Sequence, residues 1–238
     1  YYAPNNATAV IVGDVDANEV ERLAEKYFGP IPAQTPPPPV RTIEPEQTGE
    51  RRVSVHKPSA SSVNILLAYH IPASDHDDTL AIDLLSDILI SGRSSRLYRR
   101  LVDEEQLATE IWGYRPDAFD PTLLYFYAVA TPSTDAPTLE AALIDELKRI
   151  RLDSVSDTEL QKVKNQRRVA IYSGFSTING KADLLGSYEV FYDDYHRALS
   201  LSDRYNAVTK DDVQTVAERY LRKTNRTVGI LSPEQDRD

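Results

Sequence analysis

The chain has 238 residues, of which 41% are hydrophobic and 27% charged, the composition of a globular protein rather than of a collagen, a disordered tail or a coiled-coil rod. With 27 Lys and Arg against 37 Asp and Glu, the formal net charge is -10, and so acidic a chain repels phosphates, so we expect no nucleic acid partner. The absence of Cys excludes disulfides, thiol catalysis and cysteine zinc sites. No uncharged apolar run is long enough for a transmembrane helix, so we expect no membrane span.

Residues 1–31 predict one strand followed by one helix. The apolar run Thr8–Asp14 is typical of a short buried strand, and Asp16 is expected to cap a helix that ends near Phe28. A piece of this size is too small to bury a core alone, so we expect it to belong to a larger preceding domain or to pack onto the rest of the chain. The chain also opens with two tyrosines and contains no Met, which leads us to expect an excised part of a longer protein.

Residues 32–45 are rich in proline and predict a linker between domains. Four consecutive prolines, Pro36–Pro39, lack backbone N–H donors and favour the polyproline II conformation. We expect a semi-rigid spacer, with a ligand for a proline-recognition domain as the alternative. The second domain is therefore expected to occupy residues 46–238.

The pattern over residues 46–238 predicts an α+β fold, with an antiparallel sheet and helices packed on one of its faces, because strands arrive in adjacent pairs. Strands are expected at Arg52–Lys57, Ser62–Ile71, Thr109–Arg115, Thr122–Thr131 and Arg226–Leu231. Helices are expected at Asp78–Ile90 and Ser95–Glu105, from Pro137, from capping boxes at Ser156 and Thr209, and over Ser176–Ser202 with a break near Gly180 or Gly186. The segment Leu123–Ala130 is apolar on both faces, so we expect it to be central in the sheet.

The residues alone contain no complete catalytic set. None of the four histidines (His56, His70, His76 and His196) lies in the helical spacing of a zinc protease. The polar turn around His70 and His76 is expected to cap the following helix, with Asp77 or Asp78 as the cap and a loop metal site as the alternative. The segment Ser91–Arg96 is expected to be a turn between helices, with an anion site as the alternative, because it opens a helix and carries arginine.

Three segments resemble the M16 (pitrilysin/insulinase-like) metallopeptidases. Tyr2–Val15 looks like the end of the family's catalytic domain, Ala24–Pro32 continues that match, and Ser94–Leu101 is similar to a motif of its second domain. The resemblance implies the "inactive" C-terminal domain of a bacterial two-domain member related to mitochondrial processing peptidase. Residues 1–31 would then be the terminal strand and helix of the preceding catalytic-type domain.

This resemblance implies a supporting role in a zinc endopeptidase. The family's zinc motif would lie upstream or on a partner subunit, so we expect no catalytic residue, metal ligand or cofactor in this chain. The domain would close the substrate chamber, in a homo- or heterodimer with another M16 subunit, and help to hold extended peptides. By family position, the substrate-binding candidates are Gly92, Arg93, Ser94, Ser95 and Arg96, with a plain surface loop as the alternative.

One departure from the family concerns an Arg and a Tyr, seven residues apart, that bind the substrate backbone in many members. Alignment on Leu107-Ala108 places Val102 and Thr109 at these positions, and neither can replace a guanidinium or a phenol. Either a partner subunit supplies the pair or the register differs. A purely structural or protein-binding module of a non-proteolytic M16-like protein is the alternative function. Because bacterial members are often exported, we expect a periplasmic or exported protein, with the cytoplasm as the alternative.

Overall fold

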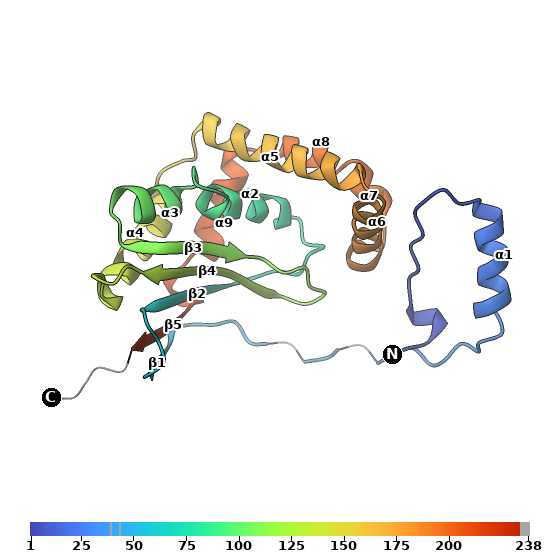
Figure 1. The fold of residues 1–238 in the computed structure, drawn as a ribbon, viewed down its shortest axis with the longest axis horizontal. Helices are drawn as coiled ribbons and strands as arrows, with labels where there is room; N and C mark the ends of the chain where they lie inside the picture. The colour runs from blue at the N-terminus through green and yellow to red at the C-terminus, as the bar shows by residue number, and fades with distance from the viewer. Residues whose placement is uncertain (39, 43, 234–238) are drawn as a thin grey trace. The chain divides into compact units, whose positions relative to one another are not determined.

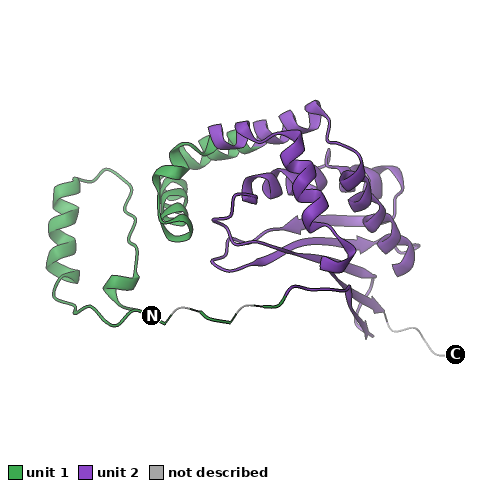
Figure 2. Cartoon of the chain, turned by 180° about the vertical axis from the view of Figure 1, so that it is seen from behind, with its two compact units in different colours: residues 1–45, 167–202 green, residues 46–166, 203–238 purple. Residues whose placement is uncertain are grey.

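The computed structural model describes residues 1–38, 40–42 and 44–233 (Figure 1). The chain forms two compact units, which Figure 2 shows in different colours. Unit 1 consists of residues 1–45 and 167–202, and unit 2 consists of residues 46–166 and 203–238. Within the described ranges, no helix is both long enough and apolar enough to cross a membrane.

Unit 2 is built on a five-stranded sheet of the order β1-β5-β2-β4-β3. The strands are β1 (Arg51–Lys57), β2 (Asn64–Ile71), β3 (Ala108–Tyr114), β4 (Thr122–Ala130) and β5 (Arg226–Pro233). Neighbouring strands are antiparallel from β5 to β3, whereas β1 runs parallel to β5. The α+β prediction is confirmed, with one parallel pair in an otherwise antiparallel sheet.

The helices begin and end close to the predicted residues. They are α1 (Ala17–Phe28), α2 (Thr79–Ile90), α3 (Arg96–Tyr98), α4 (Ala136–Leu152), α5 (Asp157–Phe175), α6 (Ile178–Tyr192), α7 (His196–Leu199), α8 (Leu201–Ala207) and α9 (Lys210–Tyr220). A π-helical turn (Arg99–Glu104) extends α3, and short 3-10 turns lie at Pro4–Asn6 and Lys223–Asn225. In Figure 1, α2 and α9 lie on the same side of the sheet.

Local capping chemistry explains several of these boundaries. The Asp16 carboxylate accepts a hydrogen bond of 2.9 Å from the Glu19 N–H at the start of α1. Thr209 and Asp212 form a reciprocal capping box at the start of α9. The helix break predicted near Gly180 or Gly186, within Ser176–Ser202, is wrong, because α6 runs through both residues. The helix ends instead at Asp193, which adopts a left-handed conformation with φ of 55°.

The core of unit 2 lies between the sheet and its helices. Alternate residues of β4 (Leu124, Phe126, Ala128 and Ala130) are buried, as the two-residue period of a strand requires. The predicted apolar stripe of α2 is also buried: Ala81, Leu84, Leu85, Ile88 and Leu89. Tyr69 of β2 packs edge-on against Phe126 at 6.0 Å between ring centroids. Burial of this apolar surface holds the helices on the sheet.

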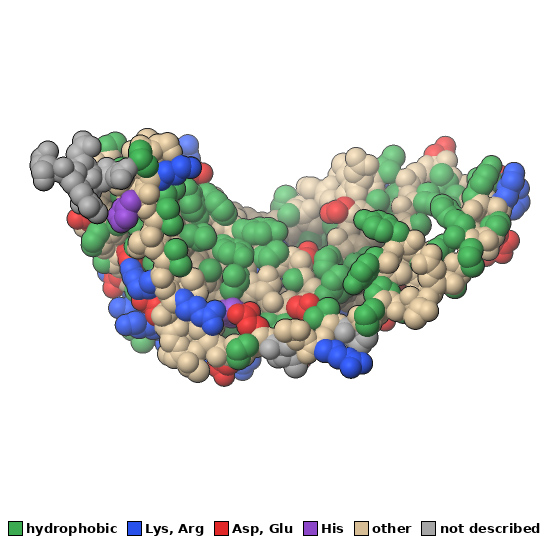
Figure 3. All heavy atoms as spheres, turned by 90° about the horizontal axis from the view of Figure 1, so that it is seen from below, with side chains coloured by type: hydrophobic (Ala, Val, Ile, Leu, Met, Phe, Trp, Pro, Cys, Tyr) green, Lys and Arg blue, Asp and Glu red, His purple; other side chains and the backbone are tan. Residues whose placement is uncertain are grey.

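The opposite face of the sheet is apolar but exposed. Trp112 of β3 is 43% exposed and lies 4.8 Å from the Tyr127 ring, and Tyr114 stacks with Tyr125. Figure 3 shows hydrophobic side chains gathered on this side of the molecule. The second apolar face of β4 therefore forms cross-strand aromatic pairs rather than a second buried layer. β4 is paired on both sides, as predicted, but the middle strand is β2.

The strand predicted at Thr8–Asp14 is wrong, because these residues form no regular secondary structure. Ile11 is 56% exposed rather than buried. A strand needs a neighbour to bond its backbone groups, and unit 1 contains no strand among its described residues. Val10 lies instead against Gly186 of α6, within the same unit.

Candidate functional site

The loop Ser91–Ser95 connects α2 to α3 and contains most of the predicted binding residues. Gly92 adopts a left-handed conformation with φ of 74°, and its carbonyl accepts a 3.1 Å hydrogen bond from the Ser95 N–H. A Cβ at Gly92 would meet no atom within 4 Å, so the backbone conformation rather than crowding favours glycine here. The predicted turn between two helices is confirmed.

Arg96 is held by a two-bond ion pair rather than presented to solvent. Its Nε lies 2.7 Å from Glu159 Oε1 and its Nη2 lies 3.0 Å from Oε2, and only 15% of its side chain is exposed. Hydrogen bonding from Arg96 and then from Ser156 lowers the pKa of Glu159 to about 2, although burial opposes this shift. Arg96 therefore anchors α3 to the beginning of α5.

The remaining loop residues divide into anchored and free positions. Lys162 donates hydrogen bonds from Nζ to the Ser94 carbonyl at 2.9 Å and to its Oγ at 3.1 Å. Ser95 is fully buried, and its hydroxyl has no hydrogen-bond partner among the described residues. Arg93 is exposed and forms no ion pair with any part of the chain that the structure describes. Of the predicted side chains, only the Arg93 guanidinium is both exposed and free of a protein partner within those ranges.

Of the two positions aligned with the family's substrate-binding pair, one lies in a π-helical turn and the other at a register shift of β3. Val102 is in the π-helical turn, where Glu105 N–H bonds to the Arg100 carbonyl at 2.8 Å. Thr109 is exposed on β3, and its hydroxyl lies 3.4 Å from the Val129 carbonyl. A π-turn contains an extra residue relative to an α-helix, which shifts side chains around the helix axis. Sequence spacing alone carries no signal for such a turn.

The histidines do not assemble into a metal centre. In the described part of the chain, no group of three or more His, Cys, Asp or Glu residues could hold a metal ion. His76 instead accepts a 3.0 Å hydrogen bond from the Asp78 N–H. Asp78 occupies the N-cap position of α2, as predicted, but its side chain makes no capping hydrogen bond. His196 lies on the surface with its Nδ1 at 3.2 Å from the Asp194 carboxylate. The donor set of these residues does not fit a zinc site.

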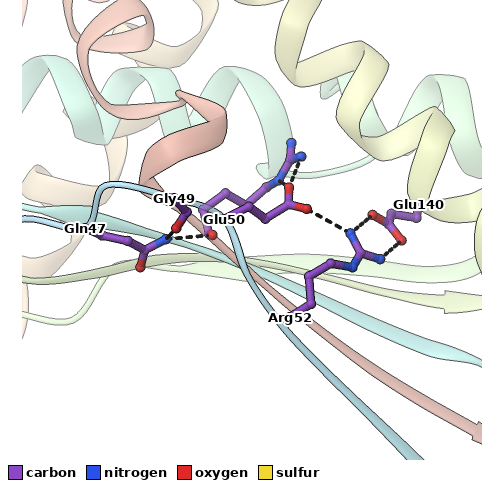
Figure 4. A network of polar contacts seen from close by, with 6 residues as sticks. Gln47, Gly49, Glu50, Arg52 and Glu140 are labelled. Carbon is purple, nitrogen blue, oxygen red and sulfur yellow. Dashed lines mark hydrogen bonds and ion pairs between the residues drawn. The ribbon is translucent and has the colours of Figure 1, made fainter.

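A charged network at the start of β1 was missed by the sequence reasoning (Figure 4). Arg52 forms two bonds of 2.7 Å with Glu140 of α4 and one of 3.1 Å with Glu50. Glu50 also accepts a 2.8 Å bond from Arg226 Nε. Burial alone would raise the pKa of Glu50, but bonds from Arg226 and Arg52 lower it overall. Partners as far as 176 residues apart leave no spacing signal in the sequence.

The comparisons with known proteins agree on one family. Residues 1–167 match the model of the peptidase M16 inactive domain. Zinc protease PqqE of Helicobacter pylori is 29% identical over 237 residues, which cover 98% of this chain and 53% of that protein. The crystal structure of a protease from Helicobacter pylori superposes with a TM-score of 0.86 at 26% identity, covering 93% of this chain and 54% of that one.

A more distant structure, the peptidase M16 inactive domain from Pseudomonas fluorescens, shares the fold. Its TM-score is 0.80 at 14% identity, and the match covers 95% of this chain and 53% of that one. The chain spans about half the length of the curated relatives it matches.

Proposed function

The chain belongs to the peptidase M16 family, whose inactive domain it matches, and we propose that it is the non-catalytic half of a zinc endopeptidase. The observation that carries this proposal is the match of residues 1–167 to the inactive-domain model. Residues 1–31 would be the end of a catalytic-type domain, residues 32–45 the linker, and residues 46–238 the inactive-type domain. This non-catalytic half would close a substrate chamber and help to hold extended peptides.

The loop containing Gly92, Arg93, Ser94, Ser95 and Arg96 is the proposed peptide-holding element. A guanidinium has five N–H donors and no acceptor, which suits it to the carbonyl groups of an extended peptide. The Arg93 side chain has all of these donors available within the described chain. Arg96 and Ser94 support the loop from within, through Glu159 and Lys162. Arg93 would thus contact substrate, while Arg96 would position the loop.

Zinc would be bound in the preceding domain or in a partner subunit, where it supplies Lewis-acid chemistry for peptide hydrolysis. A second M16 subunit, in a homo- or heterodimer, would complete the chamber. That subunit would also supply the Arg and Tyr that Val102 and Thr109 cannot replace. The assembly would act in the periplasm or outside the cell, as bacterial members of the family often do.

The test is Arg93→Ala in the intact protease assembled with its partner subunit. We expect KM for an extended peptide to rise about tenfold, the effect of losing a charge-assisted hydrogen bond, with the unfolding midpoint unchanged. Arg168→Ala, which removes an exposed arginine of α5, is the matched control and should leave KM unchanged. Unaltered kinetics in Arg93→Ala would exclude the loop from peptide binding. An intact assembly without any peptidase activity would favour the structural or protein-binding alternative.

A further inference from the structure

Unit 2 contains a cavity of about 980 Å³ between α4 and the end of the sheet formed by β1 and β5. Cationic side chains outnumber carboxylates by two in its lining, although the whole chain has a net charge of -10. The cations are Arg52, Arg100, Lys148, Arg151, Lys223 and Arg226, and the carboxylates are Glu50, Glu105, Glu140 and Asp145. This local excess of positive charge would attract an anion.

Carboxylates neutralise only some of these cations. Arg100 pairs with Glu105 at 2.7 Å, with Asp145 at 2.8 Å and with the buried Glu146 at 3.2 Å. Arg52 and Arg226 are held in the network described above. Lys148, Arg151 and Lys223 form no side-chain hydrogen bond or ion pair among the described residues. Three positive groups of the cavity therefore have no dedicated carboxylate partner within the described chain.

Two buried donors of the cavity wall also lack an acceptor. The Tyr69 hydroxyl is fully buried, and neither it nor Arg151 Nε donates to an acceptor in the described chain. Tyr69 lies directly opposite Arg226 in the sheet, but a guanidinium only donates, so it cannot accept the tyrosine proton. Burial raises the pKa of Tyr69, which keeps the proton on the hydroxyl. Orphaned buried donors of this kind are uncommon in folded proteins.

We propose that this cavity binds a small polyvalent oxyanion, with phosphate or carboxylate oxygens accepting from Tyr69 O–H and Arg151 Nε–H. The exposed Lys148 and Lys223 would neutralise its remaining charge at the rim. The volume suits a small molecule, since ligand cavities commonly measure about 300–1,000 Å³. The site is separate from the loop at Gly92–Arg96, and its occupancy does not depend on peptidase activity.

The test is calorimetric titration of the whole chain with inorganic phosphate, with citrate and with a triglutamate peptide, all at one ionic strength. We expect saturable binding of at least one of these anions, and their order of affinity identifies phosphate or carboxylate as the ligand chemistry. Tyr69→Phe keeps the ring against Phe126 and removes only the hydroxyl, so we expect the Kd to rise about tenfold. Arg151→Gln should raise the Kd by a similar factor of about ten.

Matched controls separate specific binding from general charge effects. Tyr172→Phe and Arg168→Gln make the same chemical changes at exposed positions of α5 and should leave the Kd unchanged. Circular dichroism verifies that every variant is folded. The proposal would be overturned if none of the three anions gave saturable heat. It would also be overturned if the wild type and the Tyr69→Phe and Arg151→Gln variants bound with equal affinity. Either result would mean that the cavity holds only solvent.

Discussion

The Glu159→Gln substitution removes the negative charge that pairs with Arg96. It therefore tests how much this ion pair stabilises the loop before α3. Glutamine preserves the shape of the side chain and still suits the capping position opposite Ser156. The pKa of Glu159 falls from 4.5 to about 2 in the folded chain. At about 1.4 kcal/mol for each pKa unit, this shift corresponds to at most ~3.5 kcal/mol of stability at neutral pH. Because part of the ion pair is solvated, we expect a loss of about 1–2 kcal/mol.

The pH dependence of this loss tests its electrostatic origin. A carboxyl whose pKa is lowered by folding stabilises the protein above its unfolded pKa and loses that effect as the pH falls through its folded pKa. The difference in unfolding free energy between wild type and Glu159→Gln should therefore be constant above about pH 5 and shrink toward zero near pH 2.

Urea unfolding followed by tryptophan fluorescence measures this difference within unit 2, because the only tryptophan of the chain, Trp112, lies in β3. Glu104→Gln is the matched control, since its pair with Arg99 is exposed on both sides and should change stability by less than about 0.5 kcal/mol. Equal stability of Glu159→Gln and wild type at pH 7, or a difference that persists unchanged to low pH, would refute the reasoning.

Two further substitutions test the local backbone and capping arguments. Gly92→Ala should destabilise unit 2 by about 1–2 kcal/mol, because alanine is strained at positive φ although the space around it is free; an unchanged urea midpoint would contradict this. Thr209→Ala removes the capping box with Asp212 and should cost about 1 kcal/mol in urea unfolding, whereas Thr209→Ser should retain most of the stability. Equal losses in both Thr209 variants would mean that the hydroxyl is not the stabilising group.

Features determined by neighbouring residues could be predicted from the sequence. The caps at Asp16, Ser156 and Thr209 depend on side chains three positions away, so spacing alone identified them. The stripe on α2 likewise followed from helical periodicity. The strand prediction at Thr8–Asp14 failed, because a strand depends on a neighbouring strand that the local sequence does not specify.

In the candidate site, too, local features could be predicted from the sequence, whereas contacts between distant residues could not. The loop before α3 was located correctly by its residues, but its internal contacts were not. Arg96 and Glu159 are 63 residues apart, so their ion pair has no local signal. The parallel pairing of β1 with β5 and the charged cavity beside it join residues from distant parts of the chain. Only the folded arrangement distinguishes the exposed Arg93 from the anchored Arg96.

The central claim is that this chain supports a zinc peptidase without holding the zinc itself. The most direct measurement compares zinc content and peptide cleavage for the chain alone and for the intact protein with its partner subunit, each with and without a chelator. The account predicts cleavage and stoichiometric zinc only in the intact assembly, with both lost on chelation. Zinc-dependent cleavage by the chain alone would contradict it.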